Sequence, residues 1–266
     1  MAKRHWWGEY KTTEFTDLDS DKVIAVLPVA AIEQHGPHLP VSTDTDIAQG
    51  MLDTVIELLP AEMDVRILPI QAIGKSNEHL YAPGTLTLPA NTLIDAWVAL
   101  GESVHRAGVR KLVMVNSHGG NVELMGIVAR ELRVRHGMLV AKTHWQNFGR
   151  PAGMYTEVED RHGIHGGDVE TSLMLHFKPD LVDMSRAQNF VSLAAEMERD
   201  YTHLRPTGAH AFAWVAKDIN AHGVAGDASI ATAEKGAETA HHQAEGFIEL
   251  LKDVESVPLK DGFAAF

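Results

Sequence analysis

Short runs of apolar and β-branched residues alternate along this chain with longer stretches in which apolar residues recur at helical spacing. Such alternation favours an α/β fold, in which a mostly parallel sheet is covered by helices on both faces. The spacing predicts strands over 23–29, 65–70, 111–116 and 138–143, and helices over 47–59, 92–107, 122–136, 169–177 and 229–254.

The carboxyl ends of parallel strands gather at one edge of a sheet, and ligands usually bind in the loops that begin there. Residues 183–227 show no clear periodicity, so we expect a loop excursion or an oligomer contact there rather than a second domain. No Pro/Gly/Ser-rich linker and no internal repeat is present, and we expect a single domain over residues 1–266. The functional loops are expected after Val29, Ile70, Asn116 and Thr143.

The charge balance and the absence of cysteine exclude several classes of function. The chain has 23 Lys and Arg against 36 Asp and Glu, a net charge of −13 that repels phosphate backbones, so we expect no nucleic-acid partner. No apolar stretch is long enough for a membrane span or a signal peptide, so we expect a cytoplasmic protein with no membrane partner. Without cysteine, any metal site must use His, Asp and Glu.

Histidine is unusually frequent, with 16 residues, and several lie where strands are predicted to end. After the first strand come Glu33 and His35, with Asp44 a short distance further along the chain. Imidazole with carboxylates is the ligand chemistry of zinc, manganese or iron. The alternative is that the histidines are polar loop residues and Asp44 is a helix N-cap, but the three residues together favour a metal site.

Residues 116–121, Asn-Ser-His-Gly-Gly-Asn, follow the third predicted strand. Gly119 and Gly120 allow close approach of a ligand to the backbone, and His118 is a further candidate ligand. A competing interpretation makes Ser117 a nucleophile beside His118. It is weaker, because the spacing lacks the turn that exposes a nucleophilic serine, and neighbouring residues of a strand point to opposite faces.

A third Gly-rich segment, residues 163–171, leads into a predicted helix. His165 lies on this approach and is a candidate general acid or base. Asp168 and Glu170 lie in the first helical turn, where carboxylates gain from the helix dipole, and this is the interpretation we prefer for Asp168. The pair Glu78–His79 lacks the second histidine of a zinc-binding helix, so we interpret it as part of a substrate loop rather than as a ligand pair.

Taken together, these ordered motifs resemble the creatininase (creatinine amidohydrolase) family from about residue 20 to residue 185. The matching segments are Leu-Pro-Val at 27–29, Glu-Gln-His-Gly at 33–36, Asp44, residues 116–121, His-Gly-Gly at 165–167, and Glu-Thr-Ser-Leu-Met at 170–174. The resemblance implies a three-layer αβα sandwich, homo-oligomers that are commonly hexamers, and two divalent metal ions that support amide hydrolysis.

The resemblance also implies roles for single residues. Metal ligands are implied at Glu33, His35, Asp44 and His118, with Asp44 bridging the two ions. Further implied roles are a catalytic histidine at His165, a substrate-loop serine at Ser76 and the tryptophan of a mobile flap at Trp145.

The chain departs from creatininase itself at three positions. Gly119 and Gly120 stand where creatininase has a tyrosine and a glutamate ligand, and Arg161 stands where it has an aromatic substrate residue. We expect these three positions to contact a substrate other than creatinine, with Arg161 available to hold a carboxylate. Glu170 is our candidate to replace the missing ligand, and a single-metal site is the other possibility.

The sequence therefore predicts an enzyme that hydrolyses a non-peptide C–N bond of a small polar molecule, such as an amide, lactam or formamide. Metal-activated water would attack, with one or two Zn, Mn or Fe ions per chain as the cofactor. Two alternatives remain open at this point. One is a peptidase of the mycofactocin type that trims a short peptide, and the other is a metal-binding subunit without catalytic activity.

Overall fold

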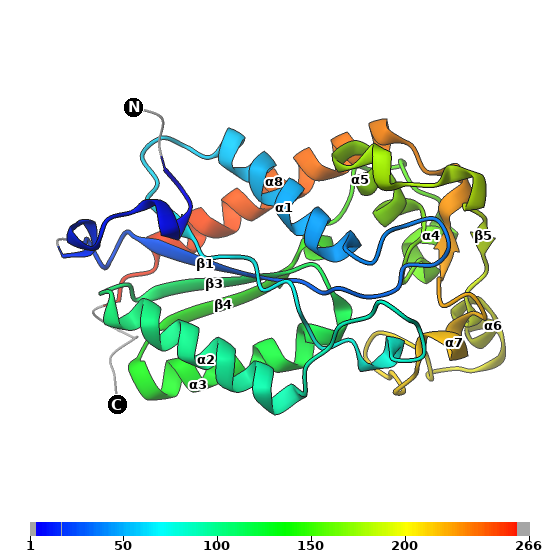
Figure 1. Cartoon of the computed structure of the whole chain (residues 1–266), viewed down its shortest axis with the longest axis horizontal. Coiled ribbons are helices and arrows are strands. Elements are labelled where there is room, and N and C mark those ends of the chain that lie inside the picture. Colours follow the sequence, from blue (N-terminus) through cyan, green and yellow to red (C-terminus); the bar gives the residue numbers. More distant parts are fainter. Residues whose placement is uncertain (1–3, 17, 260–266) are drawn as a thin grey trace.

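A four-stranded parallel sheet forms the centre of the computed structural model, which describes residues 4–16 and 18–259 (Figure 1). Register places Val29 beside Asn116, and Asn116 beside His144, so the carboxyl ends of three strands meet at one edge. In spatial order the strands are β2 (Val65–Ile67), β1 (Ile24–Val29), β3 (Lys111–Asn116) and β4 (Leu139–His144).

Helices cover both faces of this sheet. α1 (Thr43–Leu58), α5 (Asp168–Phe177) and α8 (Ala233–Ser256) pack on one face, and α2 (Ala90–Arg106) and α3 (Val122–His136) pack on the other (Figure 1). The three-layer αβα arrangement predicted from the sequence is confirmed. Of the helices that the structure describes, none is long and apolar enough to cross a membrane.

The two faces separate because neighbouring residues of a strand point in opposite directions. In β1, Ile24 and Val26 belong to the core cluster under α1, α5 and α8, whereas Ala25 and Leu27 belong to the cluster under α2 and α3. Every residue of β1 is buried, as expected for a parallel strand that is covered on both sides. The sheet is therefore a rigid platform for the loops at its carboxyl edge.

The structure moves two predicted boundaries. α1 begins at Thr43, earlier than the predicted start at 47, because Asp44 and Asp46 are acidic residues well suited to a first turn. Asp44 thus lies on the helix rather than in the preceding loop. The strand predicted over 65–70 ends at Ile67, shortly before Pro69, which has no N–H to donate to a neighbouring strand.

The segment 183–227, predicted to be irregular, contains short elements. β5 (Asn189–Phe190) and β6 (Gly226–Asp227) form a two-stranded antiparallel sheet, and α6 (Leu193–Asp200) and α7 (Ala216–Ile219) lie between them. The short α4 (Glu157–His162), also not predicted, precedes α5. These elements lie at the carboxyl edge of the main sheet, where β5, α4, α6 and α7 surround one end of the molecule (Figure 1).

Candidate metal centre and active site

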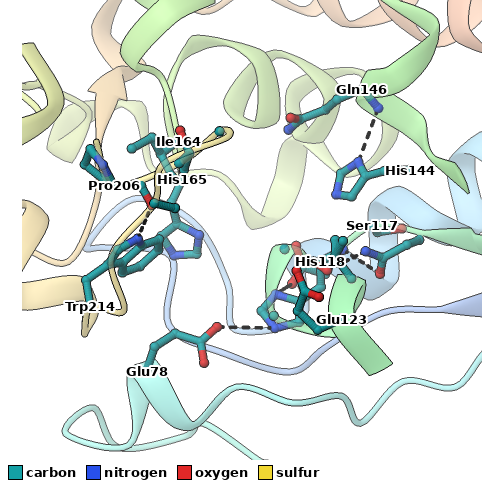
Figure 2. Close-up of a pocket in the computed structure, with 18 of the residues that line it drawn as sticks. Glu78, Ser117, His118, Glu123, His144, Gln146, Ile164, His165, Pro206 and Trp214 are labelled. Atoms are coloured by element: carbon teal, nitrogen blue, oxygen red, sulfur yellow. Dashed lines mark hydrogen bonds and ion pairs between the residues drawn. The ribbon is translucent and has the colours of Figure 1, made fainter. Parts of the chain in front are cut away.

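A cavity of about 1030 Å³ opens at the carboxyl edge of the main sheet (Figure 2). Its inner wall comes from the loops after β1, β3 and β4 and from the turn at Asn77–His79. The predicted placement of the functional loops agrees with this position. The outer wall contains residues 206–208 and 211–215 of the segment between α6 and α7.

Three buried side chains converge at the inner wall. Nδ1 of His118 lies 3.2 Å from Oε1 of Glu33 and 3.3 Å from Oδ2 of Asp44. The opposite ring nitrogen of His118, Nε2, donates to the carbonyl oxygen of Lys75 at 2.9 Å. Because this bond keeps a proton on Nε2, Nδ1, which faces the two carboxylates, is the nitrogen that would offer its lone pair to an ion.

A second group shares Asp44. The other carboxylate oxygen, Oδ1, lies 3.3 Å from Nε2 of His35, and Oε2 of Glu170 lies 3.9 Å from the same nitrogen. Nδ1 of His35 donates to the carbonyl oxygen of Glu33 at 3.0 Å, so Nε2 is the nitrogen that would offer its lone pair to an ion once its proton is lost. The two oxygens of Asp44 therefore face two different histidines, which is the arrangement of a bridging carboxylate.

Several of these buried atoms lack a hydrogen bond within the described residues, namely both carboxylate oxygens of Glu33, Nε2 of His35 and Oδ2 of Asp44. Buried polar atoms are rarely left without a partner. Lone pairs of carboxylates and imidazoles that point at one another can be satisfied by a cation between them. The residues therefore fit one or two divalent ions, and oxygen and nitrogen donors without thiolate suit zinc, manganese or iron.

The electrostatics of the centre indicate the same demand for positive charge. Burial lowers the pKa of His35, but the neighbouring Asp44 and Glu170 outweigh it and raise this pKa to about 9. Burial also lowers the pKa of His118, and Glu33 and Asp44 raise it well above its usual value. Burial raises the pKa of Glu33, yet His118 brings it down to about 2. The carboxylates thus stay ionised, and without a metal their charge is balanced by protons on His35 and His118 that a bound cation would replace.

His165 lies beside the two groups, with its ring 4.1 Å from the ring of His35. Its Nε2 donates to the backbone carbonyl of Gln34 at 2.7 Å, and its Nδ1 lies 3.7 Å from Oε1 of Glu33. Burial, together with the nearby His35, lowers the pKa of His165. A neutral His165 therefore holds one proton at Nε2 and presents a basic lone pair at Nδ1.

The glycines after β3 are not equivalent. A Cβ at Gly120 would lie 2.1 Å from the carbonyl oxygen of Lys75 and 2.6 Å from Oε1 of Glu78, whereas a Cβ at Gly119 would have no neighbour within 4 Å. Glu78 thus fills space that a side chain at position 120 would need. Ser76 is fully buried behind His118, with Oγ 3.3 Å from Nε2 of that ring.

Ser117, the nucleophile of the competing interpretation, has no basic partner among the residues that the structure describes. Its Oγ is buried and makes no hydrogen bond within the described residues. Both ring nitrogens of His118 face other groups, the carbonyl of Lys75 on one side and the carboxylates on the other. His118 therefore cannot take a proton from Ser117.

Arg161 and Trp145 lie away from the inner wall. The Arg161 guanidinium pairs with Glu198 and is largely exposed at the outer edge of the cavity. Trp145 is buried in the apolar core, with its ring 5.0 Å from that of Phe247 on α8. This position differs from that of a mobile flap, because the 3-10 turn Trp145–Phe148 directs the ring inward. A role for either residue in substrate binding stays a prediction.

The sequence analysis placed Glu78 and His79 in a substrate loop and did not select His144, and the structure places all three at the cavity. His79 is buried, with Nε2 3.3 Å from Oε1 of Glu33, and Glu78 lies 3.7 Å from His118. His144 ends β4, and its ring points into the cavity (Figure 2). His144 follows a predicted strand end, and this position could have indicated it. Neither a single histidine nor the Glu78–His79 pair has the spacing of a known metal-ligand motif.

The profile of the creatininase family, described as creatinine amidohydrolase, matches residues 8–251. The chain belongs to the creatininase family. Among its relatives, the mycofactocin precursor peptide peptidase of Mycolicibacterium smegmatis is 34% identical over 229 residues, which cover 85% of this chain and 83% of the relative. Creatinine amidohydrolase of Pseudomonas putida is 32% identical over 203 residues, covering 70% and 76%.

Solved creatininase structures share the fold. A manganese form superposes with a TM-score of 0.74 at 23% identity, covering 96% of this chain and 100% of the other. A variant of the zinc–zinc type has the same TM-score at 24% identity and covers the same shares. These creatininases carry manganese or zinc according to their descriptions. This chain therefore belongs to an amidohydrolase family. Its structure also brings together His, Asp and Glu side chains that could hold a metal ion.

Proposed function

We propose that this protein is a divalent-metal-dependent amidohydrolase that cleaves a non-peptide C–N bond of a small polar molecule other than creatinine. The observation that carries this proposal is the Asp44 carboxylate, whose two oxygens face the nitrogens of His35 and His118 at the base of an open cavity. A site closed on all sides would suit a structural ion. An ion beside a substrate-sized cavity suits catalysis.

Each ion would be held by three side chains of this chain. Glu33, Asp44 and His118 form one set, and His35, Asp44 and Glu170 form the other. Divalent ions in such sites polarise a substrate carbonyl and lower the pKa of water toward neutrality. Glu170 is further fixed by the backbone N–H of Gly166, which donates to its Oε2.

His165 would move the proton. Its Nδ1 carries a lone pair on the side of Glu33, so it can accept a proton from the attacking water. The same nitrogen can then donate that proton to the nitrogen that leaves when the C–N bond breaks. Nε2 keeps its own proton throughout, because it is bound to the carbonyl of Gln34.

A second candidate function is the trimming of a short peptide. The cavity volume of about 1030 Å³ is generous for a small amide, and its outer wall carries Phe212 and Trp214, which suit an apolar group. Mycofactocin precursor peptide peptidases are among the relatives. These observations support a peptide-sized substrate.

The test is a hydrolysis panel on untagged protein loaded separately with Zn²⁺, Mn²⁺ and Fe²⁺. The panel holds creatinine, small formamides and lactams, and a library of short peptides, with Asp44→Asn as the matched variant. Turnover of a formamide or lactam that is lost in Asp44→Asn supports the first candidate, and turnover confined to peptides supports the second. Tight metal binding without turnover of any compound would overturn both and favour a metal-binding subunit.

A further inference from the structure

The side-chain amide of Gln34 has only one possible orientation. Its Oε1 accepts from the backbone N–H of Gly36 at 2.9 Å, and its Nε2 donates to the carbonyl oxygen of Gly223 at 2.7 Å. A backbone N–H can only donate and a carbonyl oxygen can only accept. Turning the amide over would break both bonds, so the assignment of oxygen and nitrogen is fixed.

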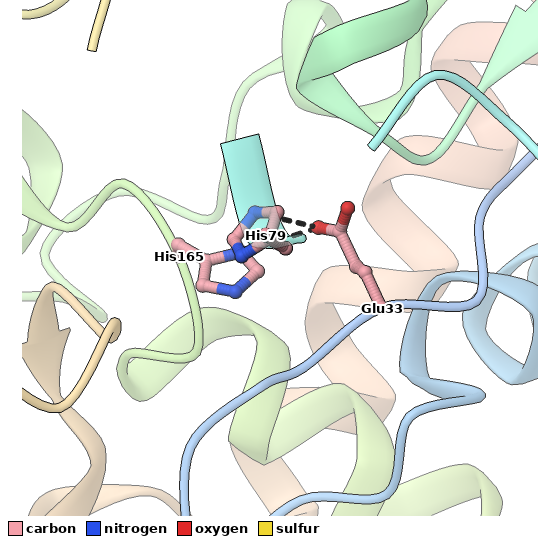
Figure 3. A group of neighbouring side chains, drawn as sticks. All are labelled: Glu33, His79 and His165. Carbon is pink, nitrogen blue, oxygen red and sulfur yellow. Dashed lines mark ion pairs between the residues drawn. The ribbon is translucent and has the colours of Figure 1, made fainter. Parts of the chain in front are cut away.

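The fixed amide determines the proton on His79. The second hydrogen of Gln34 Nε2 points to Nδ1 of His79 at 2.9 Å, so Nδ1 accepts and carries no proton. The single proton of the ring must then be on Nε2, which is the nitrogen that lies 3.3 Å from Oε1 of Glu33 (Figure 3). His79 therefore faces Glu33 with an N–H and not with a lone pair.

The backbone carbonyl of Gln34 fixes the opposite tautomer in His165. The carbonyl oxygen of Gln34 accepts from Nε2 of His165 at 2.7 Å, which leaves Nδ1 of His165 as the unprotonated nitrogen that faces Glu33 (Figure 3). The rings of His79 and His165 lie 4.6 Å apart. Gln34 thus makes His79 face Glu33 with an N–H and His165 face the same carboxylate with an unprotonated nitrogen.

We propose that Gln34 is the tautomer-setting residue of the site and that His79, held by it, is a positioning residue for Glu33 and not a metal ligand. Ligand atoms of Glu33, His79 and His165 lie within 4.8 Å of one another, so distance alone would allow an ion among them. The positions of the protons exclude His79 as a ligand of such an ion, because its Nδ1 accepts the hydrogen bond from Gln34 and its Nε2 carries the proton. The inference rests on the proposed function only in taking Glu33 as a metal ligand.

His79 acts on the metal centre through Glu33. The Nε2–H of His79 faces Oε1 of Glu33, the same oxygen that lies 3.2 Å from Nδ1 of His118. Neither oxygen of Glu33 makes a regular hydrogen bond within the described residues, so His79 acts on the carboxylate through this electrostatic contact and leaves Oε2 free for an ion. Partners of metal ligands typically change metal affinity by about 10- to 100-fold when they are removed. We expect an effect of this size when His79 loses its N–H.

The Gln34 amide also ties the metal centre to the segment between α7 and β6. Gly223, whose carbonyl receives the amide, has φ of +72°, and a Cβ there would lie 2.0 Å from Oη of Tyr81 and 2.8 Å from Nε2 of Gln34. Only glycine fits this position without displacing one of the two side chains. The orientation of the amide therefore depends on a close approach that the fold enforces.

The first experiment reads the proton directly. Long-range ¹H–¹⁵N correlation spectra of the metal-free protein labelled with ¹⁵N-histidine distinguish protonated from unprotonated ring nitrogens, with His79→Phe used for assignment. We expect His79 protonated at Nε2 in the wild type and at Nδ1 in Gln34→Glu, because a carboxylate can only accept. A wild-type His79 protonated at Nδ1 would overturn the inference, whatever the protein hydrolyses.

The second experiment measures metal affinity and stoichiometry with Co²⁺ absorption and competition titrations. His79→Phe is expected to bind the same number of ions as the wild type about 10- to 100-fold more weakly, and His79→Gln, which keeps an N–H donor, to recover part of the loss. His105→Phe, on the surface of α2, is the control. Loss of one ion per chain in His79→Phe, or unchanged affinity, would overturn the positioning role, whereas a wild type that binds no ion would contradict the proposed function instead.

Discussion

Two glycines that are adjacent in sequence have different physical reasons to be present. Gly120 packs against the carbonyl of Lys75 and the carboxylate of Glu78, while Gly119 borders open space. The first position tolerates no side chain, because the obstructing atom at 2.1 Å belongs to backbone. The second is free of this constraint, and a side chain there would extend toward the cavity that it lines.

Gly120→Ala is accordingly expected to lower the free energy of unfolding by about 1–3 kcal/mol, as overpacking does elsewhere. It should also weaken metal binding, because the displaced Lys75 carbonyl holds the ring of His118. Urea unfolding and metal titration measure the two effects. Gly119→Ala is the matched control, and equal effects from both substitutions would contradict this account.

His165→Ala tests the separation between binding metal and moving a proton. We expect turnover to fall by about 10²- to 10⁴-fold, the usual contribution of a general acid–base group, with metal content per chain unchanged. His118→Ala should lose metal and turnover together, because its Nδ1 contacts two of the ligand carboxylates. Elemental analysis beside steady-state kinetics decides the point, and loss of an ion in His165→Ala would make this residue a ligand.

At this scale, sequence reasoning could predict which polar side chains lie close together, while their roles as metal ligands stay a prediction. Glu33, His35, Asp44 and His118 could be selected together because each follows or lies near such an end, and the structure brings them together with Glu170. The place of His79 could not be predicted, because it depends on a hydrogen bond from Gln34 across distant segments. The burial of Trp145 depends likewise on packing against α8, to which its local sequence gives no guide.

At the scale of elements, α5 and α8 are joined by a buried ion pair. Asp168, in the first turn of α5, is fully buried and accepts from Nζ of Lys235 at 2.7 Å and from Oγ of Ser172 at 3.0 Å. The sequence suggested only a favourable interaction of Asp168 with the helix dipole. The partner was not predictable, since Lys235 lies on a helix far along the chain.

Lys235→Met should lower the free energy of unfolding by about 3 kcal/mol, because it leaves a buried carboxylate without its counter-charge. This loss of stability is at the low end for buried ion pairs, because the Lys235 side chain is 22% exposed to solvent. A double-mutant cycle with Asp168→Asn, followed by urea unfolding, measures the coupling. Additive effects of the two substitutions would show that the pair contributes no coupling energy.

Helices and strands with clear periodicity were the most predictable elements. The predictions for 111–116 and 122–136 coincide with β3, a short continuous apolar run, and with α3, whose apolar residues recur at helical spacing. The elements within 183–227 were not predicted, because β5, β6 and α7 are too short to show a periodic pattern of apolar residues. They are stabilised by contacts with other segments, such as the small apolar cluster of Phe190, Val224 and Ala228.

Across the whole molecule, the candidate ligands come from positions between Glu33 and Glu170, so an ion would bind segments that are distant in the chain. Ligands that bind only the folded state raise its stability by about 2.7 kcal/mol at a hundred times the dissociation constant. Zn²⁺ or Mn²⁺ should therefore raise the melting temperature of the wild type, and EDTA should reverse the shift. Asp44→Asn is expected to show little response in the same scanning calorimetry, and an equal shift in both would place the ion elsewhere.

The outer wall of the cavity, formed by residues 206–208 and 211–215, contributes none of the candidate metal ligands. This part of the cavity wall and the candidate metal ligands thus come from separate stretches of the chain. For protein engineering, residues 206–208 and 211–215 are the natural positions to randomise, because substitutions there leave every candidate metal ligand and His165 in place.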